Sequence, residues 1–432
     1  MASRPAAEIL AELEPLGVRL GLDPFRRLLA ALGSPERASA AVLVAGTNGK
    51  GSVAAMLDSI GRASGLRTGL YTSPHLDTYN ERIRVDGAPI DEAALAANLE
   101  RTLAAARDAG LPPPTVFEAL TAVAFVHYAE RGVELAVLEV GLGGRLDATN
   151  AAEPLLSIVT PLGLDHRAEL GSTLAAIARE KAGVLRKRIA AVVAAQPAVA
   201  AAALAAETRR IGALVRHVGV EVTVEAAEWR GLDGHRLRLR TPRALYELDL
   251  ALAGEHQVDN AAAAVCAAEL LAERWPSIDT AAIGRGIAGA RWPGRLEAFV
   301  LPGSGTTLLL DAAHNPAGCA ALAKFLARLA APYHLLFGCL ADKDAAGMLP
   351  ALATPAERVV LTRPRSARAQ DPGALARHLP QPASALVVAA PEAALDEALS
   401  RRPALLVVAG SIYLVGELRA AALARGARAR CA

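Results

Sequence analysis

The sequence predicts an α/β protein with two domains, each built around a mostly parallel sheet. The chain has 432 residues, which is too long for one ordinary hydrophobic core. Short, continuously apolar segments rich in β-branched residues alternate with helical stretches, a pattern typical of parallel strands covered by helices on both faces. The segment RWPGRLE (291–297) places Pro and Gly between a helical run and a second set of strands. We therefore expect a first domain over residues 1–294 and a smaller second domain over 295–432.

The candidate strands form two sets, one on each side of this boundary. The first set comprises 41–45, 135–140, 155–160 and 189–194. The second set comprises 307–312, 334–338, 358–362, 385–390 and 404–410. Between about 218 and 252 the pattern changes to an alternation of apolar and polar residues, which predicts a small antiparallel element.

Composition and charge exclude several function classes. Hydrophobic residues make up 53% and charged residues 21%, as in a globular protein. The formal net charge is +2 and charges of both signs are interspersed, so the basic stripe of a nucleic-acid-binding protein is missing from the sequence. The four cysteines form no CxxC pair and no cluster with histidine, which argues against a disulfide framework or a zinc site: Cys266, Cys319, Cys339 and Cys431.

One apolar stretch, 189–206, has the length of a membrane span, but it is mostly Ala and is interrupted by Pro197. We interpret it as a buried strand followed by a helix that begins near Pro197. Residues 1–17 read as a charged amphipathic helix without the apolar segment of an export signal. We therefore expect a soluble, cytoplasmic protein.

Lysine and asparagine are scarce in this chain. Five of the 46 basic residues are lysine, and there are six asparagines. Arginine therefore serves wherever a plain positive charge suffices, and the remaining lysines mark positions where that particular side chain matters. Most of these rare residues lie in short polar motifs: Asn48, Lys50, Asn150, Lys181, Asn260, Asn315 and Lys343.

A Gly-rich turn, GTNGKGS (46–52), follows the strand 41–45 and precedes a helix expected to begin near Ser52. This arrangement directs backbone N–H groups and a helix N-terminus at a bound phosphate, and Lys50 can reach the β- and γ-phosphates. The general pattern G-x4-G-K-[ST] is not met strictly, because Gly51 follows the lysine and Val44 stands where the first glycine would be. The metal-binding hydroxyl can therefore come from elsewhere. The plainer alternative is a Gly-rich turn with one surface lysine.

Polar residues follow several candidate strands of the first set. Glu139 ends a strand expected to be buried, where an unpaired carboxylate would be costly, so a magnesium ligand is the better interpretation. His166 and Ser73 also follow strands, at what we expect to be the same sheet edge. A packed or surface histidine is the plainer reading of His166 alone. Lys181 lies on a helix, where an exposed charge would be the ordinary explanation.

Three further polar sets occur in the second half of the chain. One set lies at the start of a helix after Gly254, and the other two follow strands. At these positions polar residues are expected to face a shared crevice. For each set taken alone, polar loop residues without a function are the simpler interpretation. The sets are His256, Gln257 and Asn260; Asp311 and His314; and Lys343 with Asp344.

Taken in order, these motifs resemble those of the folylpolyglutamate synthase/dihydrofolate synthase family, a branch of the Mur ligase superfamily. The resemblance covers nearly the whole chain: GTNGKGS, TSPHL…NERI (72–83), TVFEALTAVAF (115–125), EVGLGGRLDATN (139–150), REKAG (179–183), HQVDN (256–260), PGR, DAAHNP (311–316), DKD (342–344) and AGS (409–411). It implies a P-loop-containing N-terminal domain of the Mur ligase central-domain type, with the folate or pteroate site, and a Rossmann-like C-terminal domain that binds glutamate.

The activity that the resemblance implies is ATP- and Mg²⁺-dependent amide ligation. ATP would phosphorylate a carboxylate, and the amine of L-glutamate would then attack the acyl phosphate. The acid would be dihydropteroate for the dihydrofolate synthase activity and the γ-carboxylate of a reduced folate for the polyglutamate activity. Such a reaction sets anionic oxygens against one another, so its site needs metal ions and cations more than a general base.

The resemblance also implies roles for individual residues. Magnesium would be held by Ser73, Glu139 and His166, and the triphosphate by Gly46, Thr47, Asn48, Gly49, Lys50, Gly51 and Ser52. The nucleotide would also be reached by Asn260, Arg295 and, at its ribose side, Asp311. His314 would meet the incoming glutamate or the acyl phosphate. Further substrate contacts would come from Arg82, Phe117, Asp147 and Ser411.

Lys181 carries the sharpest implication of the resemblance, namely that it is carbamylated and acts as a carboxylate-like group near the magnesium. Carbamylation requires a neutral amine, which arginine cannot provide at any relevant pH. The alternative is an unmodified lysine that pairs with a phosphate oxygen or with Glu180.

Two other functions share part of this pattern. Another Mur-type ligase, acting on a cell-wall precursor, would share the ATP site but would need a further N-terminal domain, and about 40 residues precede the first strand. A nucleotide-binding switch protein would not need a second domain that contributes Asp311 and His314. We expect a monomer with small-molecule substrates, no nucleic-acid or membrane partner, and closure about a hinge near residue 294.

Overall fold

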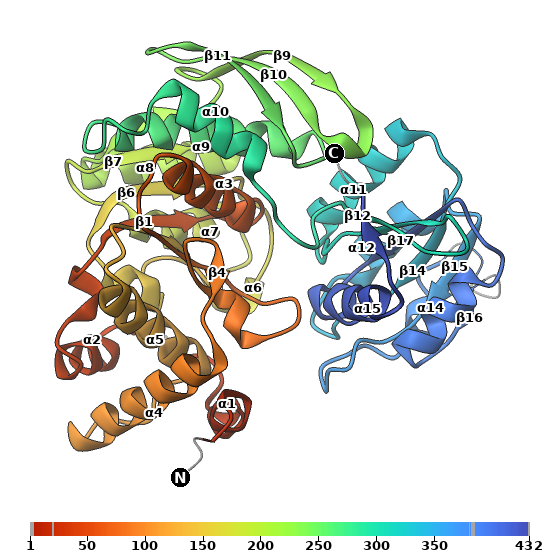
Figure 1. Ribbon diagram of the computed structural model, residues 1–432, viewed down its shortest axis with the longest axis horizontal. Helices are drawn as coiled ribbons and strands as arrows, with labels where there is room; N and C mark the ends of the chain where they lie inside the picture. The colour runs from red at the N-terminus through yellow and green to blue at the C-terminus, as the bar shows by residue number, and fades with distance from the viewer. Residues whose placement is uncertain (1–3, 20, 380, 382–384, 431–432) are drawn as a thin grey trace.

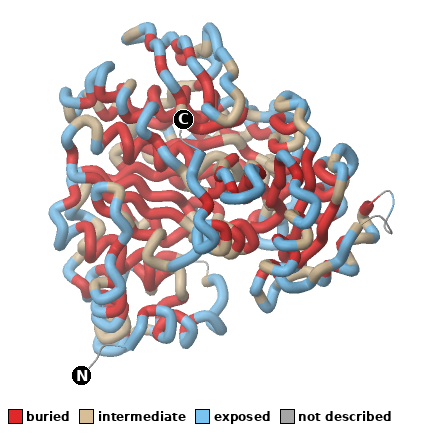
Figure 2. The backbone as a smooth tube through the Cα atoms, turned by 45° about the vertical axis from the view of Figure 1, so that its right-hand side comes forward, coloured by how far each residue is buried: buried red, intermediate tan, exposed pale blue. Residues whose placement is uncertain are grey.

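The computed structural model describes residues 4–19, 21–379, 381 and 385–430, so Cys431 lies outside the described part. Two α/β units lie next to each other, and a small antiparallel sheet lies over the first unit, at the top of the view in Figure 1, and extends toward the second. The predicted fold class is confirmed. Buried backbone runs through the strands of both units, as Figure 2 shows.

The first unit is built on an eight-stranded sheet. Its strands, in spatial order, are β4 (Ala88–Pro89), β3 (Ile83–Val85), β2 (Thr68–Tyr71), β5 (Leu135–Glu139), β1 (Ala40–Ala45), β6 (Pro154–Val159), β7 (Ala190–Val193) and β8 (Leu214–His217). The six strands from β2 to β8 in this order are parallel, whereas β3 and β4 are antiparallel additions at one edge.

Helices cover both faces of this sheet, as expected for strands that are apolar on both sides. The helices are α1 (Ala6–Leu13), α2 (Asp23–Ala31), α3 (Lys50–Ala63), α4 (Glu92–Asp108), α5 (Val116–Arg131), α6 (Arg167–Leu170), α7 (Leu174–Lys181), α8 (Ala198–Ile211), α9 (His256–Leu271) and α10 (Thr280–Gly289). Alternate residues of β1 enter the two cores: Leu43 packs in the core that contains α4 and α5. Val42 and Val44 pack in the core that contains α3 and α9.

The alternating segment forms the predicted antiparallel element, a three-stranded sheet of β9 (Thr223–Trp229), β10 (His235–Arg240) and β11 (Leu245–Leu250). Leu237 and Leu239 of β10 are buried in the core shared with α9, and the alternating residues Arg236, Arg238 and Arg240 are exposed. The stretch 189–206 folds as predicted, with β7 followed by α8 after Pro197. Within the described ranges, none of the helices combines the length and apolar character needed to cross a bilayer.

The second unit contains a seven-stranded sheet. Its strands, in spatial order, are β16 (Leu386–Val387), β15 (Arg358–Leu361), β14 (His334–Phe337), β17 (Leu405–Ala409), β13 (Thr307–Leu310), β12 (Glu297–Val300) and β18 (Arg428–Ala429). The five strands from β16 to β13 are parallel, and β12 and β18 are antiparallel. Its helices are α11 (Pro316–Leu329), α12 (Ala345–Ala353), α13 (Pro372–Ala376), α14 (Pro391–Leu399) and α15 (Ile412–Ala424).

All nine candidate strands are present, but the one expected over 385–390 is much shorter. It is reduced to β16, a two-residue edge strand whose side chains, Leu386 and Val387, are exposed. An edge strand pairs with another strand on one side only, and the side chains of β16 are exposed. Few contacts therefore stabilise a longer strand here.

Candidate active site

The carboxyl ends of four neighbouring parallel strands form one edge of the first sheet. The strands β2, β5, β1 and β6 lie side by side, so the loops that follow them meet. Glu139 is the last residue of β5, and the loops after β2, β1 and β6 lead to Ser73, the Gly-rich turn 46–52 and His166. The topology therefore brings together the four segments predicted from the sequence to share an edge.

The Gly-rich turn connects β1 to α3 directly, with Lys50 as the first residue of the helix instead of Ser52. Gly46 and Gly49 have φ of 148° and 84°, a backbone that favours glycine. Their neighbours are also too close for a side chain: a Cβ at Gly46 would collide with Thr160, and one at Gly49 with the amide of Asn260. The turn thus needs glycine both for its conformation and for its packing. The N–H groups at the start of the helix have no acceptor within the helix and are available to an anion.

Lys50 and Glu139 lie next to each other at this edge. The ammonium nitrogen of Lys50 is 3.9 Å from a carboxylate oxygen of Glu139 and donates to the Thr47 carbonyl at 3.3 Å. The other oxygen of Glu139 accepts the Ser73 N–H at 3.2 Å. Burial raises the pKa of Glu139, and Lys50 partly offsets this shift. A buried carboxylate with so few partners is well suited to a further cation.

Lys181, the last residue of α7, is buried beneath the Gly-rich turn. Its ammonium nitrogen donates to the Gly46 carbonyl at 2.7 Å. Burial, with a further contribution from Lys50, lowers the pKa of Lys181 to about 7. The alternative partner Glu180 instead pairs with Arg145 at 3.0 Å. Lys181 is therefore an amine of which a large share is neutral at physiological pH.

The first turn of α9 supports the Gly-rich turn from the side. Gln257 donates to the Ser52 hydroxyl at 3.2 Å and accepts from Asn260 at 2.9 Å. Because Gly49 lies in close contact with Asn260, this chain of amides fixes the position of the turn. His256, one turn before Asn260, lines a cavity together with Asn260 and the Gly-rich turn.

In the second unit, the loop after β13 carries Asp311 and His314. Both oxygens of Asp311 accept backbone N–H groups, from Leu296 and from Ala313, each at 2.9 Å. His314 Nδ1 lies 2.8 Å from the Ala312 carbonyl, so Nδ1 carries the proton and Nε2 is left as an acceptor. Burial lowers the pKa of His314 to about 4, which keeps the ring neutral.

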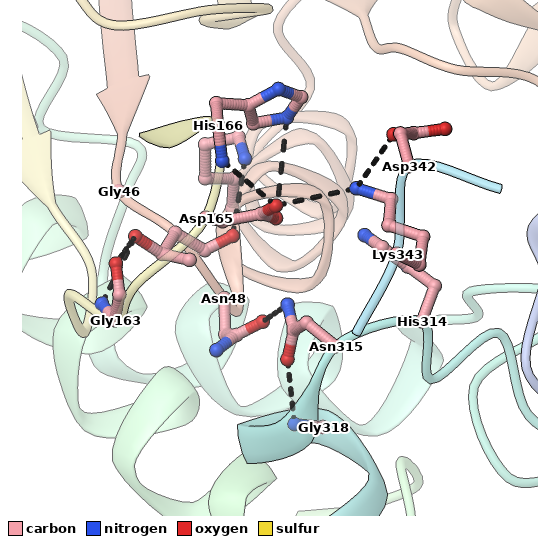
Figure 3. Close-up of polar contacts among 12 residues, drawn as sticks. Gly46, Asn48, Gly163, Asp165, His166, His314, Asn315, Gly318, Asp342 and Lys343 are labelled. Carbon is pink, nitrogen blue, oxygen red and sulfur yellow. Dashed lines mark hydrogen bonds and ion pairs between the residues drawn. The ribbon is translucent and has the colours of Figure 1, made fainter. Parts of the chain in front are cut away.

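Two polar contacts join the units across the cavity, and Figure 3 shows both. The Asn315 amide donates to the side-chain oxygen of Asn48 at 3.0 Å and its own oxygen caps α11 through the Gly318 N–H. Lys343 pairs with Asp165 at 3.2 Å. Loops from both units therefore meet over the Gly-rich turn.

A cavity of about 320 Å³ lies between the two units. Its lining includes most residues predicted from the sequence: the whole turn 46–52, Ser73, Glu139, His166, Lys181, Asn260, Arg295, Asp311 and His314. Asp165, His256 and Asn315 also line it. His166 has a left-handed backbone, and its side chain is 45% exposed, which makes it the most exposed residue of the set.

Four residues expected at the substrate are not among the described residues that line this cavity: Arg82, Phe117, Asp147 and Ser411. Arg82 donates to His75 Nδ1 at 2.9 Å, and Phe117 packs on Tyr71 with ring centroids 5.9 Å apart. The carboxylate of Asp147 accepts from Leu142 and Thr149 and so closes its own loop. Ser411 caps α15. The structure uses each of these side chains in local contacts.

Two residues of the site were missed by sequence reasoning, Asp165 and Trp292. Asp165 directly precedes His166, and that adjacency was the available signal. Trp292 lies against Gly51, which is far from it in sequence. Within the described part of the chain, no group of three His, Cys, Asp or Glu side chains is placed to hold a metal by itself. The predicted set of Ser73, Glu139 and His166 contains two residues of those types.

Both units match models of known protein domains. The model of the Mur ligase middle domain matches residues 44–268, and that of the Mur ligase glutamate ligase domain matches residues 294–412. The chain is 38% identical to the probable bifunctional folylpolyglutamate synthase/dihydropteroate synthase of Haloferax volcanii, over 97% of this chain and 50% of that protein. The chain thus spans about half the length of that curated relative.

The chain covers a larger share of the length of other similar proteins. The chain is 38% identical to the dihydrofolate synthase/folylpolyglutamate synthase of Mycobacterium tuberculosis, over 82% of this chain and 76% of that protein. A solved structure of the Mycobacterium tuberculosis folylpolyglutamate synthase complexed with ADP and AMPPCP aligns with a TM-score of 0.87 and 34% identity, over 98% of this chain and 100% of that one. The chain belongs to the folylpolyglutamate synthase/dihydrofolate synthase family of Mur ligases.

Proposed function

We propose that the chain is an ATP-dependent carboxylate–amine ligase that joins L-glutamate to dihydropteroate, to the γ-carboxylate of reduced folates, or to both. One observation carries this proposal: the phosphate-binding turn of the first unit and the His314 loop of the second line one cavity. Phosphoryl transfer from ATP to a carboxylate, followed by transfer of the acyl group to an amine, needs both a phosphate cradle and a separate place for the amine substrate. The glutamate ligase domain model, which matches the second unit, supports placing glutamate there.

The triphosphate of ATP would lie over the turn 46–52 at the N-terminus of α3. The residues of the turn line the cavity, the N-terminus of a helix favours an anion, and Lys50 adds a positive charge. Asn260 and Arg295 line the cavity and would approach the nucleotide. Asp311 has both oxygens engaged by backbone N–H groups, so we assign it a role in holding its loop beside the ribose.

The residues present fit a magnesium site that is completed by the nucleotide. Glu139 offers a buried carboxylate whose pKa is raised by burial, and Ser73 and His166 line the same cavity. Mg²⁺ usually takes one or two carboxylates and fills its other positions with phosphate oxygens and water. When bound, it would neutralise charge that develops on the phosphate oxygens. Glu139 is the residue we expect to hold it, with Ser73 and His166 in support.

The amine substrate would meet the activated carboxylate beside His314. Neutral His314 donates through Nδ1 to Ala312, which leaves Nε2 free to accept an N–H from the attacking amine. Its low pKa makes it a weak base, so we assign it orientation of the amine more than removal of a proton. Lys343, held by Asp165, brings positive charge to the same side of the cavity.

We further propose that Lys181 is carbamylated. Its buried amine, with a pKa of about 7, supplies the neutral form that reacts with CO₂. The amine nitrogen bonds to the carbon of CO₂ as one C=O bond opens to a carboxylate, and the proton leaves to solvent. The product is an anion in place of a cation, in the cavity that Lys50 and Glu139 also line. Such an anion would attract Mg²⁺ or orient its ligands, whereas an ammonium group would repel it.

Other predictions remain proposals. We assign the ATP and folate sites to residues 1–294 and the glutamate site to 295–432, with closure about a hinge near 294. Arg82, Phe117, Asp147 and Ser411 are retained as substrate residues that closure or loop movement would have to bring to the cavity. The monomeric state and the cytoplasmic location stay predictions.

Glutamate-dependent release of phosphate from ATP tests the proposal. Purified protein is assayed with dihydropteroate and with tetrahydrofolate in separate reactions, each with and without L-glutamate. Release with either acid that depends on L-glutamate is expected, and the acid that supports it identifies the activity. Release with neither acid, or at a rate independent of glutamate, would contradict the proposal.

A further inference from the structure

The segment that joins the two units, residues 290–296, is anchored at its first end on the phosphate-binding turn. A Cβ added at Gly51 would lie 2.8 Å from Cζ2 and 2.9 Å from Nε1 of Trp292, so the indole lies directly on the backbone of Gly51. Trp292 also packs against the core that contains α3, the helix that begins in this turn. The preceding helix, α10, is in close contact with α3 as well: a Cβ at Gly286 would collide with Ile60.

The other end of the segment is anchored on the loop that carries His314. The Gly294 carbonyl accepts the Ala312 N–H at 2.8 Å. Two residues later, the Leu296 N–H donates to the carboxylate of Asp311 at 2.9 Å. These bonds attach the connecting segment to the first two residues of the loop 311–315, Asp311 and Ala312.

One residue, Pro293, separates the two anchors. Its ring fixes its own φ, and it restricts the backbone of Trp292 before it. Gly294 follows with φ of 72°, and a Cβ there would lie 3.0 Å from Leu76. A single, proline-restrained residue links the two anchors, so a displacement of the indole is passed to the His314 loop.

We infer that Trp292 is a positioning residue that sets the His314 loop relative to the phosphate-binding turn. The indole also lines a crevice of about 40 Å³ beside Ser73, Glu139 and Arg295, next to the place where the reacting groups must meet. The inference rests on the proposed function, because it concerns how the two substrates of that reaction are brought together. It assigns Trp292 an effect on turnover and not on nucleotide affinity.

Substitution of Trp292 tests this assignment, with Trp275 as the matched control. Trp275 is another partly buried indole packed against the same core, and it is not among the described residues that line the cavity or the crevice. In Trp292→Ala, kcat should fall at least about tenfold, while the Kd for AMPPCP with Mg²⁺ should stay within about threefold of wild type. Trp292→Phe keeps a ring on Gly51 and should recover most of the rate, and Trp275→Ala should change kcat by less than about threefold.

Three outcomes would overturn the inference. They are unchanged kcat in Trp292→Ala, a loss of AMPPCP affinity as large as the loss of rate, and a loss in Trp292→Phe equal to that in Trp292→Ala. Thermal unfolding of each variant shows whether it is folded. If Trp292→Ala does not fold, Trp292→Phe is compared with Gly51→Ala. Because an added Cβ at Gly51 would displace the ring, their effects on kcat should be non-additive in the double variant, and simple additivity would count against the contact.

Tryptophan fluorescence gives a readout that does not depend on the ligase reaction. The chain has three tryptophans, so the double substitution Trp229→Phe/Trp275→Phe leaves Trp292 as the single emitter. Its emission should change on titration with AMPPCP and Mg²⁺, because the indole lies on the turn that binds the triphosphate. An unchanged emission at saturating AMPPCP would overturn the inference. Absence of ligase activity in the wild type together with this emission change would contradict only the proposed function.

Discussion

The ammonium nitrogen of Lys343 lies 3.2 Å from the carboxylate of Asp165, although 178 residues separate them in sequence. Asp165 follows a strand of the first sheet and Lys343 follows a strand of the second, so their ion pair spans the two units. Their side chains are 14% and 12% exposed. Burial by itself would raise the pKa of Asp165, but Lys343 and the two nearby histidines lower it below its usual range.

Replacing Asp165 with Asn should impair the reaction by releasing Lys343. A nearly buried ammonium that loses its anionic partner is destabilised and reorients, and we expect kcat/KM to fall about tenfold. Asp342→Asn is the control, because Asp342 lies farther from Lys343, at 3.9 Å, and is more exposed. Steady-state kinetics of both variants decide the point, and equal losses would show that the pair with Asp165 has no special role.

The ion pair between Asp165 and Lys343 predicts how the stability of the protein depends on pH. Because the pKa of Asp165 is lowered in the folded protein, the pair contributes stability above the ordinary carboxyl pKa. That contribution is lost as the pH falls through the lowered pKa. At neutral pH the thermal unfolding temperature of the wild type should therefore be higher than that of Asp165→Asn. This difference in unfolding temperature should shrink only in strong acid. A difference that disappears already at mildly acidic pH would argue against a lowered pKa.

Lys50→Ala should abolish ATP turnover and leave the fold intact. The side chain lies at a sheet edge, where its contacts are the Thr47 carbonyl and Glu139, so little packing is lost. Phosphate release and far-ultraviolet circular dichroism measure the two effects. A variant that keeps more than a tenth of the wild-type rate, a change below about 1.4 kcal/mol, would show that Lys50 does not hold the transferred phosphate.

Glu139→Gln should remove the magnesium dependence of the reaction together with most of its rate. The amide keeps the shape of the side chain but not the charge that holds a hard cation. His166→Ala should be milder and should mainly raise the magnesium requirement, because imidazole is an unusual ligand for a hard cation and this ring is half exposed. Rates measured across a magnesium titration test this ranking of the two variants. The ranking is wrong if both variants lose the same share of the wild-type rate at saturating magnesium.

Lys181→Arg separates a carbamate from a plain cation. Arginine keeps the positive charge but cannot be carbamylated, so a carbamate-dependent enzyme should lose most of its rate. Because the pKa of Lys181 is lowered to about 7, the neutral amine becomes the major form as the pH rises through that value. Activation by bicarbonate should accordingly be stronger above that pH than below it. Near-normal activity of Lys181→Arg would exclude the carbamate.

Much of the fold could be predicted because buried parallel strands are continuous apolar runs. The strands that were missed lack this pattern. In β2, Gly69 interrupts the run because the ring of Tyr128 occupies the space where a Cβ would lie, with Cε1 2.9 Å away. β3 and β12 are short and contain charged residues, Arg84 and Glu297.

The site was predictable where it depends on local motifs and not where it depends on contacts between the units. The turn 46–52 and Glu139 are identified by residue types next to strands. The contacts of Asp165 with Lys343 and of Trp292 with Gly51 join distant segments, and a single sequence does not reveal such pairs. Ser411 and Asp147 were expected at the substrate, but the hydrogen bonds they make are local.

Transfer of carboxylate oxygen tests the central claim most directly. Dihydropteroate or tetrahydrofolate with heavy oxygen in the reacting carboxylate is incubated with the protein, ATP, Mg²⁺ and L-glutamate, and the released phosphate is analysed by mass spectrometry. An acyl phosphate transfers one carboxylate oxygen to phosphate when the amine displaces it, so one heavy oxygen should appear in the phosphate for each amide formed. Amide formation with unlabelled phosphate would contradict the acyl-phosphate account.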